Sequence, residues 1–154
     1  MKTLMLIVDT SVAARWVIGT ANPALAEETQ IALSLLPRGL AAPDQLVAEF
    51  ANAMLNKVRA GEIGEKQARE AVAALPQVVD FLPTARFADS AIEISLDLRH
   101  PAYDCFFLAA AMALDTQVVT ADGRFANRCL GTPFEPFIAR LNSRADWTDD
   151  RRPA

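Results

Sequence analysis

The 154-residue chain is poor in the side chains from which many catalytic and metal sites are built. It has one histidine, His100, and two cysteines, Cys105 and Cys129. Two cysteines without close spacing indicate neither a disulfide framework nor a zinc site. A single histidine excludes a histidine-rich metal site, and it excludes Ser-His-Asp and Cys-His mechanisms unless His100 itself takes part. Because His100 precedes Pro101, we expect it at a solvated helix end.

Long apolar runs are also missing. No run reaches the roughly 18 residues that a membrane-spanning helix needs. The start, MKTLMLIVD, resembles a short signal peptide, but its apolar run is brief, ends in an acid and is followed by no small-residue cleavage site. We therefore expect a first β-strand in a cytoplasmic protein that makes no membrane contact.

The net charge is −4, which by itself argues against a nucleic-acid partner. The distribution of charge weakens this argument, because the tail segment DWTDD supplies three of the acids and 12 of the 15 basic residues are arginines. Arginine is suited to bidentate contacts with phosphate. A cluster of arginines follows the last apolar run: Arg124, Arg128, Arg140 and Arg144. For each of them, a solvated charged surface is the alternative.

The pattern of apolar residues predicts strands that alternate with helices. Strands are predicted at 4–8, 40–43, 77–83 and 116–122, with an edge strand at 133–138. Helices are predicted at 23–36, 44–60, 65–75, 86–99 and 101–114, with Asp44 as an N-cap and Pro76 as a stop. A short helix or turn is predicted at 11–18, and a short arginine-bearing helix after residue 122. This alternation is typical of βαβ units, so we expect an α/β fold with a central, mainly parallel sheet. One domain covers residues 1–142, and the tail 143–154 is expected to be loose.

Acidic residues stand where the predicted elements begin or end. The run TLMLIVDTS stops at Asp9 and the run TQVVTADGRF at Asp122, while Glu49 and Asp104 lie near helix starts. The carboxyl ends of parallel strands are where α/β sheets form their sites. If the four carboxylates meet, each like-charged pair costs roughly 4 kcal/mol at about 4 Å and an effective dielectric of about 20. Mg²⁺ or Mn²⁺, which prefer oxygen ligands, would relieve this repulsion.

Each acid also has an ordinary structural explanation. Asp9 could cap a helix, and Asp122 could be a turn residue before Gly123. Asp104 could stabilise a helix N-terminus, and Glu49 could face solvent. The metal site is favoured by the recurrence of four acids at element ends and by none of them alone.

Polar neighbours of the acids are candidates to support them, namely Thr10, Ser11, Asn52 and Thr120. Hydroxyl groups beside a ligating carboxylate can orient it. Asn52 and Asn56 share the helix face of Glu49. Tyr103, beside Asp104, could close a crevice or stack on a base.

Four segments resemble the PIN-domain ribonucleases in their order and spacing, and within these the VapC-type toxins of bacterial and archaeal toxin–antitoxin pairs. The segments are IVDTSV, LVAEFANAML, YDCFFLAAAMAL and VVTADGRF. The resemblance runs from Leu4 to about Arg140 and implies a three-layer α/β/α fold. It assigns the family's acidic residues to Asp9, Glu49, Asp104 and Asp122, and the hydroxyl before the last acid to Thr120. Cys105 stands where the family usually has a small residue such as alanine, which we interpret as a packing variation.

The resemblance also implies a function. It implies Mg²⁺- or Mn²⁺-dependent endonuclease action on RNA, a homodimer, and inhibition by a small VapB-like antitoxin. The four acids would hold one or two ions, which would lower the pKa of a bound water. Arg124 and Arg128 are candidates for contacts with the RNA backbone. With one histidine, the chain cannot be a metal-free ribonuclease that uses paired histidines.

Three other functions are compatible with parts of the pattern. A haloacid-dehalogenase-type phosphatase needs a second aspartate at the position where this chain has Ser11. A receiver domain needs a lysine late in the chain, but the last lysine is Lys66. The sequence therefore disfavours both functions. The main alternative is a degenerate PIN domain that binds RNA or a partner protein without cutting.

Overall fold

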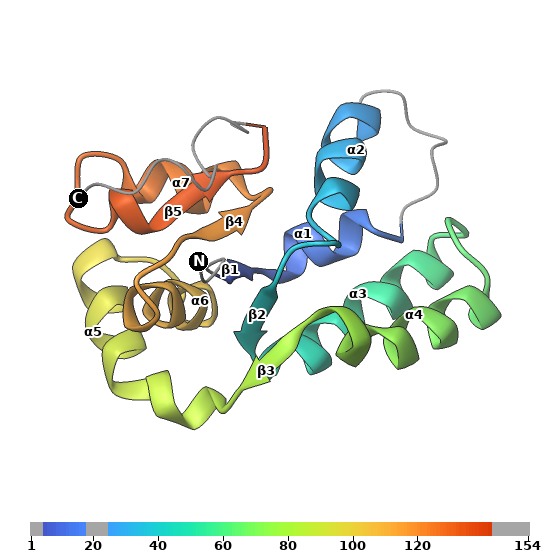
Figure 1. The fold of residues 1–154 in the computed structure, drawn as a ribbon, viewed down its shortest axis with the longest axis horizontal. Helices are drawn as coiled ribbons and strands as arrows, with labels where there is room; N and C mark the ends of the chain where they lie inside the picture. The colour runs from blue at the N-terminus through green and yellow to red at the C-terminus, as the bar shows by residue number, and fades with distance from the viewer. Residues whose placement is uncertain (1–4, 18–24, 143–154) are drawn as a thin grey trace.

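The computed structural model describes residues 5–17 and 25–142 (Figure 1). Several sequence-based expectations lie outside these residues: the element ends at Leu4, Ile18 and Pro23, the arginine Arg144, and the loose tail 143–154. The domain division at residue 142 stays a prediction.

Five parallel strands form the centre of the molecule, in the order β3-β2-β1-β4-β5. They are β1 (Leu6–Val8), β2 (Leu40–Pro43), β3 (Asp80–Leu82), β4 (Val118–Thr120) and β5 (Ile138–Arg140). All residues of β1, β2 and β4 are buried, as their continuous apolar runs predict for a sheet covered on both faces. The predicted parallel α/β sheet is therefore confirmed.

Helices cover both faces of this sheet. They are α1 (Thr10–Arg15), α2 (Ala26–Ser34), α3 (Gln45–Arg59), α4 (Glu65–Val78), α5 (Ala88–Leu98), α6 (Ala102–Ala113) and α7 (Gly123–Cys129). In Figure 1, α5 and α6 lie on one side of the central strands, and α1 and α3 lie on the other. This is the three-layer α/β/α arrangement that was expected. Within the described ranges, no helix is long and apolar enough to cross a membrane.

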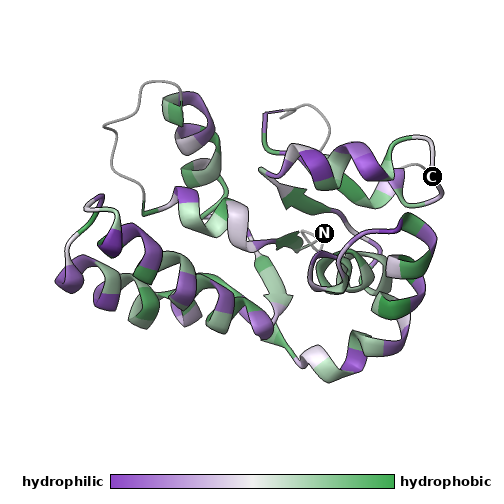
Figure 2. Ribbon diagram, turned by 180° about the vertical axis from the view of Figure 1, so that it is seen from behind, coloured by the Kyte–Doolittle hydropathy of each residue, from purple (hydrophilic) through white to green (hydrophobic). Residues whose placement is uncertain are grey.

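One part of the hydrophobic core lies between α6 and the sheet. Helix α6 packs against β1, β2 and β4, and it buries Cys105, Phe107 and Leu108. Figure 2 shows the central strands in green, with purple polar positions on the outer helices. Burial raises the pKa of the Cys105 thiol to about 12, so Cys105 is an inert packing residue, as interpreted from the sequence.

The order in which successive strands are added to the sheet reverses between β1 and β4, although all the strands are parallel. The chain proceeds from β1 to β2 and β3 on one side, and then crosses to β4 and β5 on the other. Such a reversal is a topological switch point, where α/β sheets open a crevice at the carboxyl ends of their strands. Asp9 follows β1 and Asp122 follows shortly after β4, so the fold places both acids at this crevice.

The prediction that Pro76 ends a helix was wrong, because Pro76 lies inside α4. Proline fits the helical φ angle, and its missing N–H removes only one backbone hydrogen bond. The helix ends two residues later at Val78, so little regular structure depends on that bond. Strand β3 consequently starts at Asp80 and not at the predicted residue 77.

Asp44 occupies the predicted N-cap position of α3, but it makes no capping hydrogen bond there. Its carboxylate accepts hydrogen bonds from the backbone N–H of Thr84, at 3.0 Å, and from the Thr84 hydroxyl. The Thr84 hydroxyl in turn accepts from the Gln45 N–H at 2.9 Å. A residue 39 positions away therefore caps the helix, which local sequence rules cannot foresee.

Two short 3₁₀ helices replace parts of predicted elements. The predicted helix 86–99 divides into a 3₁₀ turn, η2 (Thr84–Phe87), and α5. Half of the predicted edge strand 133–138 is the 3₁₀ turn η3 (Glu135–Phe137), and the edge strand β5 begins only at Ile138. Pro136 in the first turn of η3 lacks a donor for a strand ladder, which favours this shift.

Candidate active site

Asp9 is the most buried of the four acids, with 4% of its surface exposed. Its Oδ1 accepts from the Val12 N–H at 3.2 Å, so Asp9 is the N-cap of α1, and also from the Ser11 hydroxyl at 2.5 Å. Its Oδ2 accepts from the Thr120 hydroxyl at 2.5 Å. Asp9 therefore caps a helix and also accepts hydrogen bonds from neighbouring hydroxyl groups, as the two sequence-based explanations proposed.

The hydroxyls around Asp9 also join the ends of β1 and β4. Ser11 Oγ accepts from the Ala121 N–H at 2.9 Å, and Thr120 Oγ1 accepts from the Asp122 N–H at 3.0 Å. Each hydroxyl thus fixes a carboxylate oxygen on one strand end and a backbone amide on the other. The position of Asp9 is coupled by this network to the segment that carries Asp122.

Burial raises the pKa of Asp9 to about 6. The hydrogen bonds from Ser11, Thr120 and Val12 lower this pKa, and the charge of Asp104 raises it, but desolvation is the largest effect. The buried environment of Asp9 therefore disfavours the ionised form of its carboxyl group. A nearby cation would stabilise its charged form.

Glu49, on α3, lies half-buried beside the same strand end. Its Oε1 accepts from the Thr10 hydroxyl at 3.1 Å, and its Oε2 accepts from the Gln45 side-chain amide at 2.8 Å. Burial is the main cause of a raised pKa for Glu49, and the charge of Asp104 adds to it. Because the charge of Asp104 affects both Asp9 and Glu49, the three carboxylates share one electrostatic environment.

Gln45 is a residue that the sequence analysis missed. Besides Glu49, its amide Nε2 donates to the backbone carbonyl of Tyr103 at 2.9 Å. It therefore joins the first turn of α3 to the first turn of α6, where Asp104 lies. Its spacing of four residues from Glu49 on one helix face was the available signal.

Replacing Gln45 by alanine is expected to lower the free energy of unfolding by about 1–3 kcal/mol, because two hydrogen bonds of roughly 0.5–1.5 kcal/mol each are lost. The pKa of Glu49 should rise further, since the Gln45 bond lowers it. Urea denaturation and an NMR titration of the Glu49 carboxyl measure these effects. The control is Gln30→Ala at an exposed position of α2, which should change neither quantity. An unchanged Glu49 pKa in Gln45→Ala would contradict the assigned contact.

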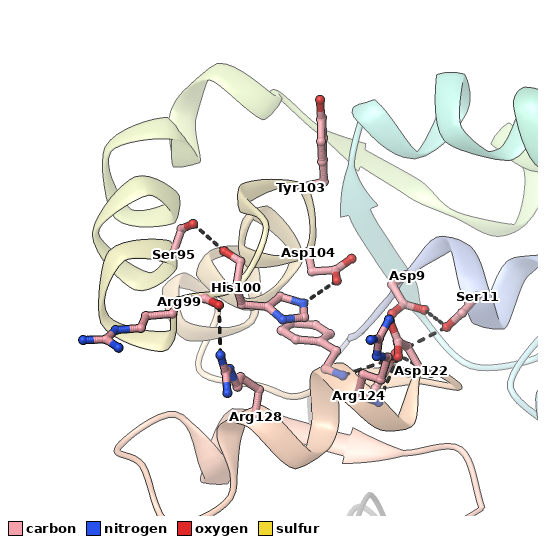
Figure 3. A network of polar contacts seen from close by, with 12 residues as sticks. Asp9, Ser11, Ser95, Arg99, His100, Tyr103, Asp104, Asp122, Arg124 and Arg128 are labelled. Atoms are coloured by element: carbon pink, nitrogen blue, oxygen red, sulfur yellow. Dashed lines mark hydrogen bonds and ion pairs between the residues drawn. The ribbon is translucent and has the colours of Figure 1, made fainter.

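Asp104 lies in the first turn of α6 and is paired with His100. The His100 Nε2–H donates to Asp104 Oδ2 at 2.6 Å, and the imidazole stacks on Phe125 with 5.0 Å between ring centroids (Figure 3). Only 12% of the His100 side chain is exposed. The prediction of a solvated histidine was wrong, because the ring turns inward between two helices.

Asp122 is the N-cap of α7. Its Oδ1 accepts from the N–H groups of Arg124 at 2.9 Å and Phe125 at 3.4 Å. Asp122 and Asp104 line a common cleft of about 520 Å³, whose other walls are basic residues and a proline: Arg99, His100, Pro101, Arg124 and Arg128. The cleft therefore combines two of the acids with the arginines predicted to contact a polyanion.

Three polar residues singled out from the sequence do not contribute to the site as predicted. Asn52 and Asn56 are exposed, and no hydrogen bond joins Asn52 to the four acids within the described residues. Tyr103 is 72% exposed, and its side chain extends away from His100 and Asp104 (Figure 3), so it does not close the cleft. Gln45, and not the predicted Asn52, donates a hydrogen bond to Glu49.

The donor chemistry of these residues fits a hard divalent cation. The candidate ligands are carboxylates with neighbouring hydroxyls, the oxygen ligands that Mg²⁺ and Mn²⁺ prefer. In the described part of the chain, no three carboxylate, imidazole or thiol groups lie close enough together to form a metal site as they stand. Among the described residues, the four acids therefore do not form one cluster as they stand.

Comparisons with known proteins agree with this architecture. The chain matches the PIN domain family over residues 6–129. It is 40% identical over 103 residues to Ribonuclease VapC1 from two strains of Mycobacterium tuberculosis, a match that covers 64% of this chain and 74% of the relative. The crystal structure of PAE2754 from Pyrobaculum aerophilum shares the fold, with a TM-score of 0.63 at 16% identity over 92% of both chains. The chain therefore belongs to the PIN-domain family and, within it, to the VapC type.

Proposed function

We propose that this protein is a metal-dependent endoribonuclease that acts as the toxin of a toxin–antitoxin pair. The observation that carries the proposal is that Asp9 and Asp122 follow the two strands at the switch point of a PIN fold, while Asp104 and Asp122 line a cleft with arginines. The relative VapC1 is named a ribonuclease, which supports the same activity here.

In the proposed reaction, RNA phosphodiester bonds are hydrolysed. Asp9, Glu49, Asp104 and Asp122 would hold Mg²⁺ or Mn²⁺, which when bound lowers the pKa of a coordinated water and neutralises charge on the phosphate. The chain's own hydroxyls and amides prepare the ligands. Ser11 and Thr120 fix both oxygens of Asp9, and Thr10 and Gln45 fix both oxygens of Glu49.

The arginines of the cleft provide contacts for the RNA backbone. Arg124 and Arg128 are exposed on α7 and line the cleft, whereas the Arg99 guanidinium points away from them in Figure 3. Arg128 Nη2 donates to the Arg99 carbonyl at 3.2 Å, which directs its guanidinium along the cleft wall. Binding through such contacts weakens as salt concentration rises, because counterions are released from the phosphates.

The proposed partners follow from the VapC type: an RNA substrate, a VapB-like antitoxin and a second copy of the chain in a homodimer. Exposed apolar side chains, among them Ile92 and Leu96 one turn apart on α5, offer surface for such contacts. We place the protein in the cytoplasm, in agreement with the free thiols of Cys105 and Cys129.

A second candidate is a PIN module that binds RNA or a partner without cutting it. The spacing of the acids favours this candidate, since no three of them form a metal site as they stand. Metal-dependent cleavage distinguishes the two functions.

Purified protein is expected to cut total cellular RNA into discrete fragments with Mg²⁺ or Mn²⁺ and to leave it intact with EDTA. Asp104→Asn should abolish cutting while the circular dichroism spectrum stays unchanged. The matched control is Asp89→Asn, an exposed acid in the first turn of α5, which should cut normally. RNA binding without cleavage by the well-folded parent protein would establish the binding module instead.

A further inference from the structure

We propose that His100 is a positioning residue that orients the Asp104 carboxylate for divalent-metal binding. The inference rests on the proposed function and assigns a role in it to His100, which is not one of the four acids. The structural basis is the place of His100 between α5, α6 and α7, where contacts with Ser95, Asp104 and Phe125 fix it.

The backbone of His100 is held from α5. Its N–H donates to the Ser95 carbonyl at 3.3 Å, and the Ser95 hydroxyl donates to the His100 carbonyl at 2.5 Å. The preceding residue, Arg99, ends α5 in the left-handed region with φ of 52°. This turn reverses the chain and directs the His100 side chain toward the N-terminus of α6.

The ring of His100 is held from α7. It stacks on Phe125 at an interplanar angle of 14°, and Phe125 itself is fully buried. The Phe125 N–H also donates to Asp122 at 3.4 Å. One aromatic contact therefore connects the imidazole to the helix whose first turn carries another of the acids.

The Nε2–H of His100 donates a hydrogen bond to one oxygen of Asp104 and leaves the other oxygen available to a metal ion. Asp104 Oδ2 accepts from the ring at 2.6 Å, and in residues 5–17 and 25–142 no hydrogen bond to Oδ1 is seen. A carboxylate held in this way keeps one rotamer and presents its second oxygen to an ion. Hydrogen-bonding partners of metal ligands typically contribute about 10–100-fold to metal affinity or activity.

The test measures Mn²⁺ binding to the RNA-free protein by electron paramagnetic resonance, together with kcat and KM for RNA cleavage. His100→Ala is expected to bind Mn²⁺ about 10–100-fold more weakly and to lose kcat with little change in KM. His100→Gln keeps an N–H donor and should recover most of the affinity. Phe125→Leu keeps an apolar side chain without the stacked ring and should weaken Mn²⁺ binding less than His100→Ala.

The control variant is Lys66→Ala, which removes an exposed ion pair of the same i,i+4 spacing, with Glu70. It should bind and cleave like the parent. Unchanged or tighter Mn²⁺ binding in folded His100→Ala would overturn the inference, as would a raised KM alone, which would mean that His100 contacts RNA. If the parent protein itself neither binds Mn²⁺ nor cleaves RNA, the proposed function fails instead.

Discussion

An Asp9→Asn variant is expected to cleave RNA on the order of 10³-fold more slowly than the parent, a loss of about 4 kcal/mol of transition-state stabilisation. Asparagine cannot supply the negative charge that a bound cation needs. Its side-chain oxygen can still accept from Ser11 and the Val12 N–H, so the local structure should persist. The effect should therefore appear in kcat, with the fold intact.

The same variant is expected to be more stable than the metal-free parent at neutral pH. Folding buries an ionised Asp9, and removal of that charge removes the desolvation cost that raises its pKa. Lower activity with higher stability is typical of a residue retained for function. Single-turnover cleavage and urea denaturation in EDTA measure the two effects.

The matched control is Asp80→Asn, at an exposed aspartate on the edge strand β3. It should change neither cleavage nor stability appreciably. Equal cleavage by Asp9→Asn and the parent would exclude Asp9 from the reaction. A large loss of stability in Asp9→Asn would mean that the carboxylate is a structural cap first.

The second large effect concerns pH. In the metal-free protein, Asp9 is expected to reduce the free energy of unfolding by up to about 3 kcal/mol as pH rises from about 4 to about 6. The folded-state pKa is about 6, against 3.8 for an unperturbed aspartate. Between these values the folded state binds more protons than the unfolded state. The stabilisation is therefore complete below the unfolded pKa and is lost as pH rises through the folded pKa.

Glu49 contributes in the same direction, because its pKa is also raised. Urea denaturation at a series of pH values in EDTA, for the parent and for Asp9→Asn, isolates the Asp9 contribution. The difference between the two curves should grow from pH 4 to pH 6 and then stay constant. Parallel curves across this range would show that Asp9 titrates normally.

Addition of Mg²⁺ at pH 7 should reverse the loss in the parent alone. A ligand that binds only the folded state at about 100 times its Kd contributes about 2.7 kcal/mol. Because Asp9→Asn lacks the carboxylate, its stability should respond little to the ion.

The sheet and the acids could be predicted from the sequence because both follow local patterns. Continuous apolar runs predicted buried parallel strands, and the alternation with helices predicted the crossovers. Asp9 and Asp122 were found because they directly follow such runs. These inferences need no knowledge of which strands are neighbours.

The contacts that orient the acids could not be predicted in the same way. His100 was assigned to solvent because Pro101 begins a new helix, and the stacking with Phe125 depends on how α7 packs. Gln45 and His100 each precede an acid by four residues. Residues at this spacing are neighbours on every helix face, so the spacing alone does not identify a functional pair. Their partners are selected by tertiary packing, which brings Tyr103 and Phe125 next to them.

The link between Asp9 and Thr120 has a consequence for synthesis. The two residues are 111 positions apart, so the Asp9 environment is complete only after β4 has been made and has paired with β1. A ribosome that has produced only the first hundred or so residues carries a chain with Asp9 and Glu49 but without Asp122. We expect such a nascent chain to be inactive, since contacts of high sequence separation form late. A proposed toxin built in this way cannot cut RNA before its synthesis has passed β4.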